Sequence, residues 1–137
     1  MKNKIIGFYP MVADVLHAGH ILALKEAKAN CDYLIVGLHC CPNYKKPVQT
    51  IFERYIQLQA VKYVDEVIPY TDINDAESMI KSLNYDIYFC GEDHKDKDFE
   101  NKQVLIDLGK QIYYLSRKHN FSSTNLKERL KWKDLFK

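Results

Sequence analysis

The feature that most constrains the fold is a regular alternation of short β-rich runs with longer helical patterns along the chain. Runs rich in Val, Ile, Tyr and Leu predict strands at residues 4–9, 33–38, 66–70, 86–90 and 111–115. Apolar residues at helical spacing predict helices at residues 19–30, 51–64, 75–83 and 99–108, and a last helix from Ser122 or Ser123 to about Leu130. Pro10 is expected to end the first strand, because proline cannot donate to a central ladder. The alternation predicts a single α/β domain over residues 1–137, Rossmann-like, with three α/β/α layers and a parallel sheet of about five strands.

Composition excludes several classes of protein. Of the 137 residues, 47% are hydrophobic and 28% charged, which excludes a mainly disordered chain. The net charge of +2, from 20 Lys and Arg against 18 Asp and Glu, is too balanced for a protein that coats nucleic acid. Apolar runs are shorter than the roughly 20 residues of a membrane span, and the N-terminus lacks the apolar stretch of a secretion signal. We therefore expect a cytoplasmic protein with neither nucleic acid nor membrane as partner.

The cysteines give a weaker indication. Cys31, Cys40, Cys41 and Cys90 contain no C-x-x-C pair, and two of them are adjacent. This pattern favours structural or incidental thiols over disulfides or a zinc site. A reducing compartment is consistent with it.

The segment His17-Ala18-Gly19-His20 carries the strongest functional indication. It follows the first predicted strand and opens the first predicted helix, at the sheet edge where parallel α/β folds bind ligands. Free amides at the helix N-terminus, two imidazoles and a glycine that permits close approach together favour a phosphate site. Metal ligation and incidental histidines are the weaker alternatives, the first because no third ligand has matching spacing.

This segment resembles the H-x-G-H motif of the nucleotidyltransferase superfamily, and three further stretches resemble its glycerol-3-phosphate cytidylyltransferase branch. Residues 62–68 read K-Y-V-D-E-V-I, where the branch has R-Y-V-D-E-V-I. Residues 91–94 read G-E-D-H against G-D-D-W, and residues 117–124 read R-K-H-N-F-S-S-T against R-T-E-G-I-S-T-T. The resemblance covers nearly the whole chain, with the motifs in family order.

The resemblance implies transfer of a nucleotidyl group from a nucleoside triphosphate to a phosphorylated acceptor, with release of pyrophosphate. Lys127 stands where adenylyltransferases often have arginine, which favours CTP. The expected product is therefore a CDP-alcohol made from a small phosphorylated alcohol such as glycerol 3-phosphate. Two alternatives stay open: an adenylyltransferase that uses ATP on a mononucleotide or cofactor phosphate, and a nucleotide-binding module without turnover.

The resemblance also assigns roles to individual residues. Residues expected to act in catalysis are His17, His20, Lys45, Lys46 and Arg117. Residues expected to bind the nucleotide are Val12, Ala13, His17, Gly19, His20, Asp93, Arg117, Ser122, Ser123 and Thr124, and those expected to bind substrate are Asp14, Lys46 and Arg54. For Arg54 substrate contact and pairing with a carboxylate are equally open, and Asp14 either holds a histidine or caps the helix. Mg²⁺ is expected to be held mainly by the triphosphate and not by protein ligands, and a homodimer is expected through the region of residues 62–68.

Three departures from the family pattern bear on the substrates. The usual G-T-F-D before the histidines reads Met11-Val12-Ala13-Asp14, so a glycine and an aromatic residue are missing, and His94 replaces a tryptophan. Residues 71–77 read T-D-I-N-D-A-E, where glycerol-phosphate enzymes carry basic residues. This acidic stretch suits an acceptor with a positive group, although an ordinary acidic helix start is the preferred interpretation.

Overall fold

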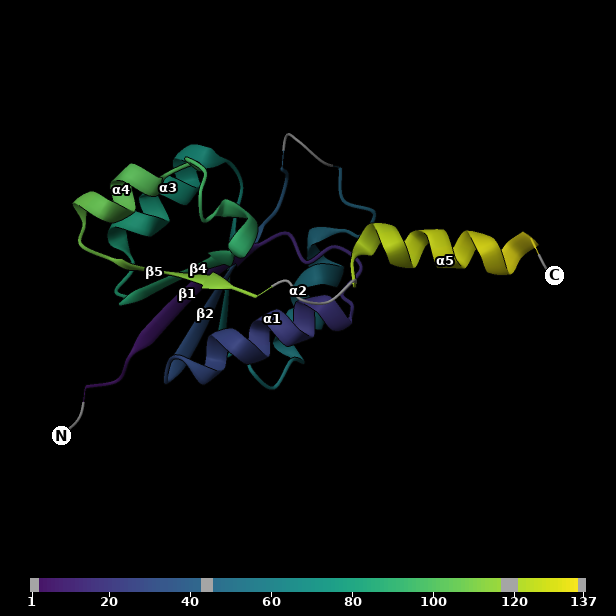
Figure 1. Cartoon of the computed structure of the whole chain (residues 1–137), viewed down its shortest axis with the longest axis horizontal. Helices are drawn as coiled ribbons and strands as arrows, with labels where there is room; N and C mark the ends of the chain where they lie inside the picture. The colour runs from purple at the N-terminus through teal and green to yellow at the C-terminus, as the bar shows by residue number, and fades with distance from the viewer. Residues whose placement is uncertain (1–2, 43–45, 117–120, 136–137) are drawn as a thin grey trace.

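The computed structural model describes residues 3–42, 46–116 and 121–135. Five parallel strands form one sheet in the order β3-β2-β1-β4-β5. The elements in chain order are β1 (Ile6–Met11), α1 (Ala18–Ala29), β2 (Tyr33–His39), α2 (Ile51–Gln59), β3 (Glu66–Tyr70), α3 (Ile73–Ser82), β4 (Ile87–Gly91), the short 3-10 helix η1 (Glu92–His94), α4 (Lys102–Asp107), β5 (Gln111–Leu115) and α5 (Ser123–Leu135). Helices α1 and α2 cover one face of the sheet and α3 and α4 the other (Figure 1). The predicted Rossmann-like parallel sheet is confirmed.

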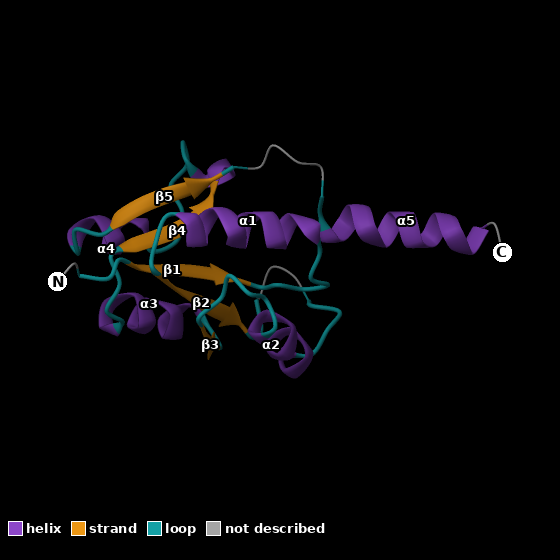
Figure 2. Cartoon of the chain, turned by 90° about the horizontal axis from the view of Figure 1, so that it is seen from below, coloured by secondary structure: helices purple, strands orange, loops and turns teal. Residues whose placement is uncertain are grey.

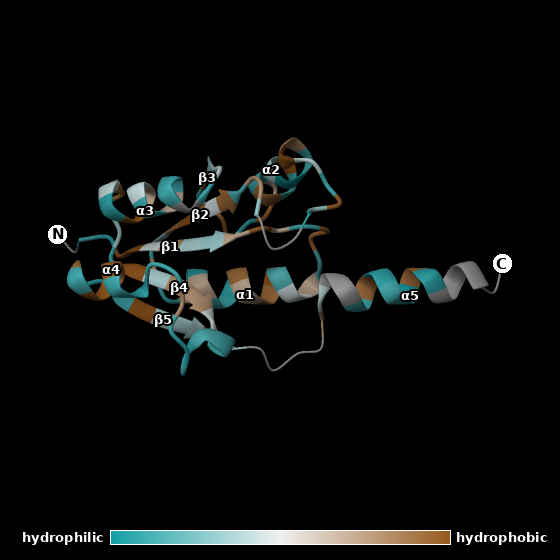
Figure 3. Ribbon diagram, turned by 90° about the horizontal axis from the view of Figure 1, so that it is seen from above, coloured by the Kyte–Doolittle hydropathy of each residue, from teal (hydrophilic) through white to brown (hydrophobic). Residues whose placement is uncertain are grey.

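Burial on both faces explains why the strands read as continuous apolar runs. Every residue of β4 is buried, as are the five central residues of β2. On one face, Leu24 of α1 and Leu58 of α2 pack on the sheet, and on the other Ile80 of α3 and Leu105 of α4 do so. Figure 3 shows hydrophobic and hydrophilic residues alternating along α1, of which Gly19, Leu24 and Ala27 are buried.

Helix α5 is arranged differently from the other helices. It projects away from the sheet in both Figure 1 and Figure 2. Leu130 near its middle is half exposed. No helix within the described ranges is long and apolar enough to cross a bilayer.

The prediction that Pro10 ends the first strand is wrong, since β1 runs through Pro10 to Met11. Pro10 is paired with Gly37 of β2, but β4 pairs with β1 only at Gly7 and Phe8. Pro10 therefore lies where the strand has a neighbour on one side alone, and there a missing N–H is tolerated.

Helix boundaries differ from the prediction for identifiable reasons. Helix α2 ends at Gln59 and not at residue 64, because tight turns follow in which the Val61 and Val64 N–H groups donate three residues back. Helix α3 begins two residues early, because Asp72 caps it by accepting from the Asp75 N–H. Helix α4 begins only at Lys102, because Asn101 before it has the left-handed φ of +68°. Helix α5 continues beyond residue 130 to Leu135.

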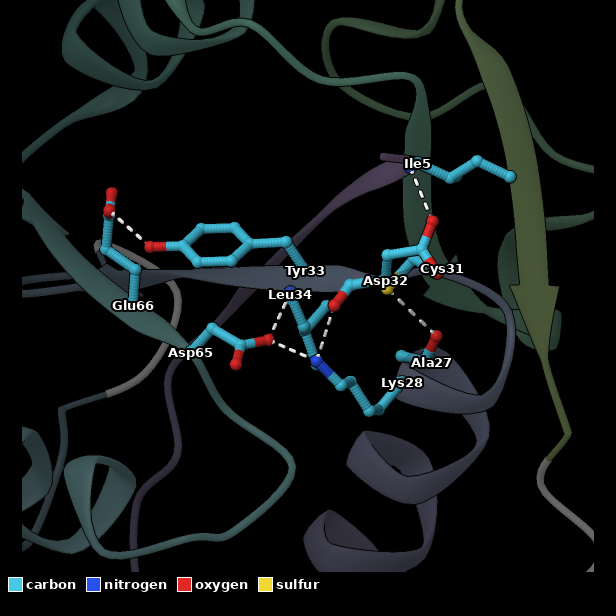
Figure 4. A network of polar contacts seen from close by, with 9 residues as sticks. All are labelled: Ile5, Ala27, Lys28, Cys31, Asp32, Tyr33, Leu34, Asp65 and Glu66. Carbon is cyan, nitrogen blue, oxygen red and sulfur yellow. Dashed lines mark hydrogen bonds and ion pairs between the residues drawn. The ribbon is translucent and has the colours of Figure 1, made fainter. Parts of the chain in front are cut away.

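A polar network fixes the amino ends of the central strands (Figure 4). The Lys28 ammonium donates to the Asp32 carbonyl and pairs with Asp65, whose carboxylate also accepts the Leu34 N–H. Burial acts to raise the pKa of Asp65, but the Lys28 and Leu34 hydrogen bonds outweigh it, so this pKa is lowered. The residues that follow α2 are thereby fixed to the start of β2.

The close packing of β1 on β2 predicts that Gly37→Ala destabilises the fold. A Cβ at Gly37 would lie 2.8 Å from Cζ of Phe8, which is 2% exposed and packed among Tyr85 and Tyr88. We expect a loss of about 2 kcal/mol in the free energy of unfolding, measured by urea denaturation. The control is Gly109→Asn, since no atom lies within 4 Å of a Cβ there and asparagine tolerates its φ of +70°. A Gly37→Ala protein as stable as the parent would contradict this packing.

Candidate active site

A cavity of about 640 Å³ opens at the carboxyl edge of the sheet, where the strand order reverses between β1 and β4. On the α1 side it is lined by the loop after β1 and the first turn of α1, including Ala13, His17, Gly19 and His20. On the α3 and α4 side it is lined by residues at the ends of β2, β3 and β4 and by the segment before α4. The cavity lies where the sequence predicted a ligand site.

The two histidines are held by a reciprocal cap at the start of α1. His17 is the N-cap, and its Nδ1 accepts from the Gly19 N–H at 3.0 Å. His20 closes the capping box, because its Nδ1 accepts from the His17 N–H at 3.1 Å. Ring centroids lie 3.9 Å apart. Since both Nδ1 atoms accept, the proton of each neutral imidazole is on Nε2.

The loop between β1 and α1 has an unusual backbone conformation. Ala13 and Val15 have φ values of +55° and +51°, a region that β-branched residues such as Val15 rarely adopt. The Val15 N–H donates to Oε1 of Gln49 at 2.8 Å, so a hydrogen bond from another loop supports this conformation. Ala13 is buried and lines the cavity. The altered Met11-Val12-Ala13 turn therefore adopts a defined shape without a glycine.

Asp14 connects this loop to the segment before α2. Its carboxylate is 1% exposed and accepts from the N–H groups of Val48 at 3.0 Å and Gln49 at 2.9 Å. Nζ of Lys127, from the second turn of α5, lies 3.6 Å from Oδ2 of Asp14. Asp14 therefore fixes the segment before α2 and anchors α5, roles that the two open alternatives did not include.

Arg54 is a buried cation bound entirely by main-chain oxygens. It is 2% exposed, and its guanidinium donates to the carbonyls of Gln49, Val12, His39 and Cys40 at 2.7–3.3 Å. These carbonyls belong to the loop after β1, the end of β2 and the segment before α2. Of the two alternatives for Arg54, pairing with a carboxylate is not found among the described residues, and the guanidinium instead donates to main-chain carbonyls of two cavity residues, Val12 and His39.

Some of the other predicted site residues line the cavity and others do not. Val12 and Ser122 line the cavity, and the Ser122 hydroxyl accepts from the Asn125 N–H, which confirms Ser122 as a cap of the last helix. Ser123 and Thr124 begin α5. Lys46 and Asp93 are exposed and do not line the cavity, and Oδ2 of Asp93 lies 3.8 Å from Nε2 of His94. Lys45 and Arg117 lie outside the described residues.

Several cavity residues were missed by the sequence reasoning. They lie at or just beyond the end of a strand, inside β4 or before α4, and they are His39, Tyr70, Asp72, Ser116, Tyr88, Phe99 and Glu100. The rule that parallel sheets bind ligands at their carboxyl edge, applied to every strand and not only to the first, finds those of them that end or follow a strand.

The described lining of the cavity contains carboxylates but neither lysine nor arginine. Among described residues the lining includes three carboxylates, Asp14, Asp72 and Glu100, but neither lysine nor arginine. Burial, the largest effect, lowers the pKa of His39, so this imidazole is neutral at pH 7. No group of three or more His, Cys, Asp or Glu side chains that could hold a metal ion is found in the described part of the chain.

Comparison with known proteins gives one matching family and several similar chains. The profile of the cytidylyltransferase-like family matches residues 8–129. A glycerol-3-phosphate cytidylyltransferase of Bacillus subtilis (strain 168) is 33% identical over 122 residues, covering 85% of this chain and 90% of that protein. An ethanolamine-phosphate cytidylyltransferase of Mus musculus is 39% identical over 84 residues, covering 58% of this chain and 21% of that protein. The crystal structure of a lipopolysaccharide core biosynthesis protein from Thermoplasma volcanium GSS1 matches with a TM-score of 0.72 at 26% identity, covering 85% of this chain and 100% of that one.

The position of Arg54 predicts a large loss of stability in Arg54→Lys. A lysine ammonium has three donors and a different shape, so at least one of the four buried carbonyls loses its partner. We expect a loss of about 3 kcal/mol in the free energy of unfolding by denaturant titration. Arg129→Lys on the exposed side of α5 is the control and should change stability by less than about 0.5 kcal/mol. Equal stability of the two variants would show that the guanidinium does not hold these loops.

Proposed function

Because the chain belongs to the cytidylyltransferase-like family and is a cytidylyltransferase, we propose that it transfers a cytidylyl group from CTP to a small phosphorylated alcohol. The products are a CDP-alcohol and pyrophosphate. The observation that carries this proposal is the pair of imidazoles of His17 and His20, which cap the N-terminus of α1 and line a cavity at the sheet's switch point.

The chemistry required of these residues is mainly positioning and charge stabilisation. A phosphate oxygen of the acceptor attacks the α-phosphorus, a new P–O bond forms, the bond to the bridging oxygen breaks, and that oxygen leaves with pyrophosphate. A phosphomonoester is mostly dianionic at neutral pH, since its second pKa is about 6, so the attacking oxygen needs no strong base. His17 and His20 would donate to oxygens whose negative charge grows in the transition state. Asp14 and Arg54 would hold the loops that aim them.

Mg²⁺ fits this site as a companion of the nucleotide. Within the described residues no carboxylate cluster could hold it, and Asp14, the carboxylate beside His17, already accepts two main-chain N–H groups. The ion would therefore be bound mainly by triphosphate oxygens, as magnesium commonly is, and would neutralise their charge.

The proposal predicts pyrophosphate release that depends on CTP, Mg²⁺ and a phosphorylated alcohol. In a coupled pyrophosphate assay we expect His17→Asn or His20→Asn to lower kcat by about 10²- to 10³-fold, because one donor to a developing charge is lost. EDTA should abolish the release. The control is Gln103→Asn, which should keep full activity, since Gln103 is exposed in α4 and does not line the cavity.

Three outcomes would contradict parts of the proposal. Release with ATP but not CTP would indicate an adenylyltransferase. Binding of CTP in calorimetry without release for any acceptor would indicate a nucleotide-binding module. Full activity of both histidine variants would exclude the pair from the reaction.

We also propose that the protein is a homodimer through the α2 side of the sheet. Phe52 and Ile56 of α2 are 69% and 50% exposed. A mostly apolar groove that includes Val61 and Tyr63 adjoins α2, next to the stretch 62–68. Paired copies would bury these side chains.

Light scattering after size exclusion should give twice the chain mass for the unmodified protein. Phe52→Glu should give a monomer, because a charge would be buried without a partner at the contact. Leu130→Glu, on the exposed part of α5, is the control and should stay dimeric. A monomer mass for the unmodified protein would overturn the proposal.

A further inference from the structure

Two adjacent cysteines, Cys40 and Cys41, directly follow β2 at the carboxyl edge of the sheet. Their sulfur atoms lie 3.1 Å apart, within hydrogen-bonding contact. Cys41 is exposed and lines the cavity, whereas Cys40 is partly buried beside it. Nucleotidyl transfer needs neither thiol, so the pair is a reactive group on the cavity wall with chemistry of its own.

The backbone of this pair is held by hydrogen bonds on both sides of Cys40. Its N–H donates to the Tyr70 carbonyl at 2.8 Å, and its carbonyl accepts from Nη2 of Arg54 at 2.8 Å. That carbonyl belongs to the peptide bond between Cys40 and Cys41. The same guanidinium also donates to the Val12 carbonyl in the loop after β1. A rotation of the peptide between the two cysteines would therefore disturb the contacts that hold the cavity wall.

The two thiols are not equally accessible to a reagent. Cys41 is exposed to solvent, so an oxidant reaches its sulfur first. The hydrogen bond with Cys41, followed by burial, raises the pKa of Cys40 although Arg54 acts to lower it, so Cys40 stays a thiol. Redox-sensing cysteines are typically accessible and lie next to a second cysteine that resolves the first oxidation product. Cys41 and Cys40 have the positions that these two roles require.

We propose that Cys40 and Cys41 are a redox modification site, which a hydroperoxide converts into a disulfide between adjacent residues. The Cys41 sulfur attacks the hydroperoxide: an S–O bond forms, the O–O bond breaks, and the thiol proton leaves with the alcohol product. The Cys40 sulfur then attacks the sulfenic sulfur of Cys41: the S–S bond forms, the S–O bond breaks, and the hydroxyl group leaves as water with the Cys40 proton. The two sulfurs together lose two electrons, which reduce the hydroperoxide to an alcohol and water.

The geometry of adjacent residues makes this disulfide reversible. Consecutive Cα atoms are about 3.8 Å apart, whereas disulfides usually join Cα atoms about 4.4–6.8 Å apart, so the bridge is strained and easily reduced. Strained and exposed disulfides are the labile, regulatory ones. Closing the ring turns the peptide between Cys40 and Cys41, which weakens its bond to Arg54. Oxidation therefore loosens the cavity wall, and a dithiol reductant restores it.

The first test identifies the product by mass. The reduced chain is treated with tert-butyl hydroperoxide, its remaining thiols are alkylated, and the peptide that holds residues 40 and 41 is measured. We expect this peptide to lose about 2 Da, to stay unalkylated, and to regain both thiols with a dithiol reductant. Cys31→Ser is the control and should give the same product, since serine keeps a donor for the Ala27 carbonyl. Two alkylated thiols after oxidation, or a sulfinic acid at Cys41, would overturn the proposal.

The second test measures the consequence for the fold and the site. Oxidation should lower the Tm of the unmodified chain by about 3–6 °C, because a hydrogen bond to a charged group weakens. It should also lower kcat/KM for CTP about tenfold, because the cavity wall shifts. A dithiol reductant should reverse both effects.

Cys41→Ser cannot close the bridge, so the same treatment should cause no change in it that the reductant reverses. An oxidised chain with the Tm and kcat/KM of the reduced one would overturn the link to Arg54. The mass and the Tm are measured without turnover. A chain that forms the disulfide but releases no pyrophosphate in either redox state would therefore count against the proposed function and not against this site.

Discussion

The site depends on one buried cation. The Arg54 guanidinium donates to four main-chain carbonyls. These carbonyls belong to the loop after β1, the end of β2 and the segment before α2. Carbonyl oxygens that converge without a donor would repel one another and leave unsatisfied acceptors in the interior. A planar group with five donors is the side chain that can satisfy them together. The carboxyl ends of β1 and β2 are therefore held in one arrangement before any ligand binds.

The buried carboxylate of Asp14 binds the same segment before α2 as the Arg54 guanidinium. Asp14 accepts from the main-chain N–H groups of Val48 and Gln49, and Arg54 donates to the carbonyl of Gln49. Both the N–H groups and a carbonyl of this segment are therefore hydrogen-bonded. The bond from Val15 to the Gln49 side chain ties the left-handed loop conformation to the same segment. The loop ends at His17, which is the N-cap of α1. Preorganisation of the imidazoles is thus a consequence of buried polar contacts between loops, and not of the helix alone.

Local patterns and tertiary contacts account for different parts of this structure. The order of strands and helices and the place of the histidines follow from periodicity and from the rule for parallel sheets, so the sequence predicts them correctly. The path of β1 through Pro10 depends on how far β4 extends beside it, which no local pattern records. The same limit applies to Arg54, because its partners are carbonyls that meet only in the fold. The acidic residues 71–77 are typical of a helix start, and Asp72 caps α3 as such, but its place in the cavity lining depends on where β3 ends at the carboxyl edge of the sheet.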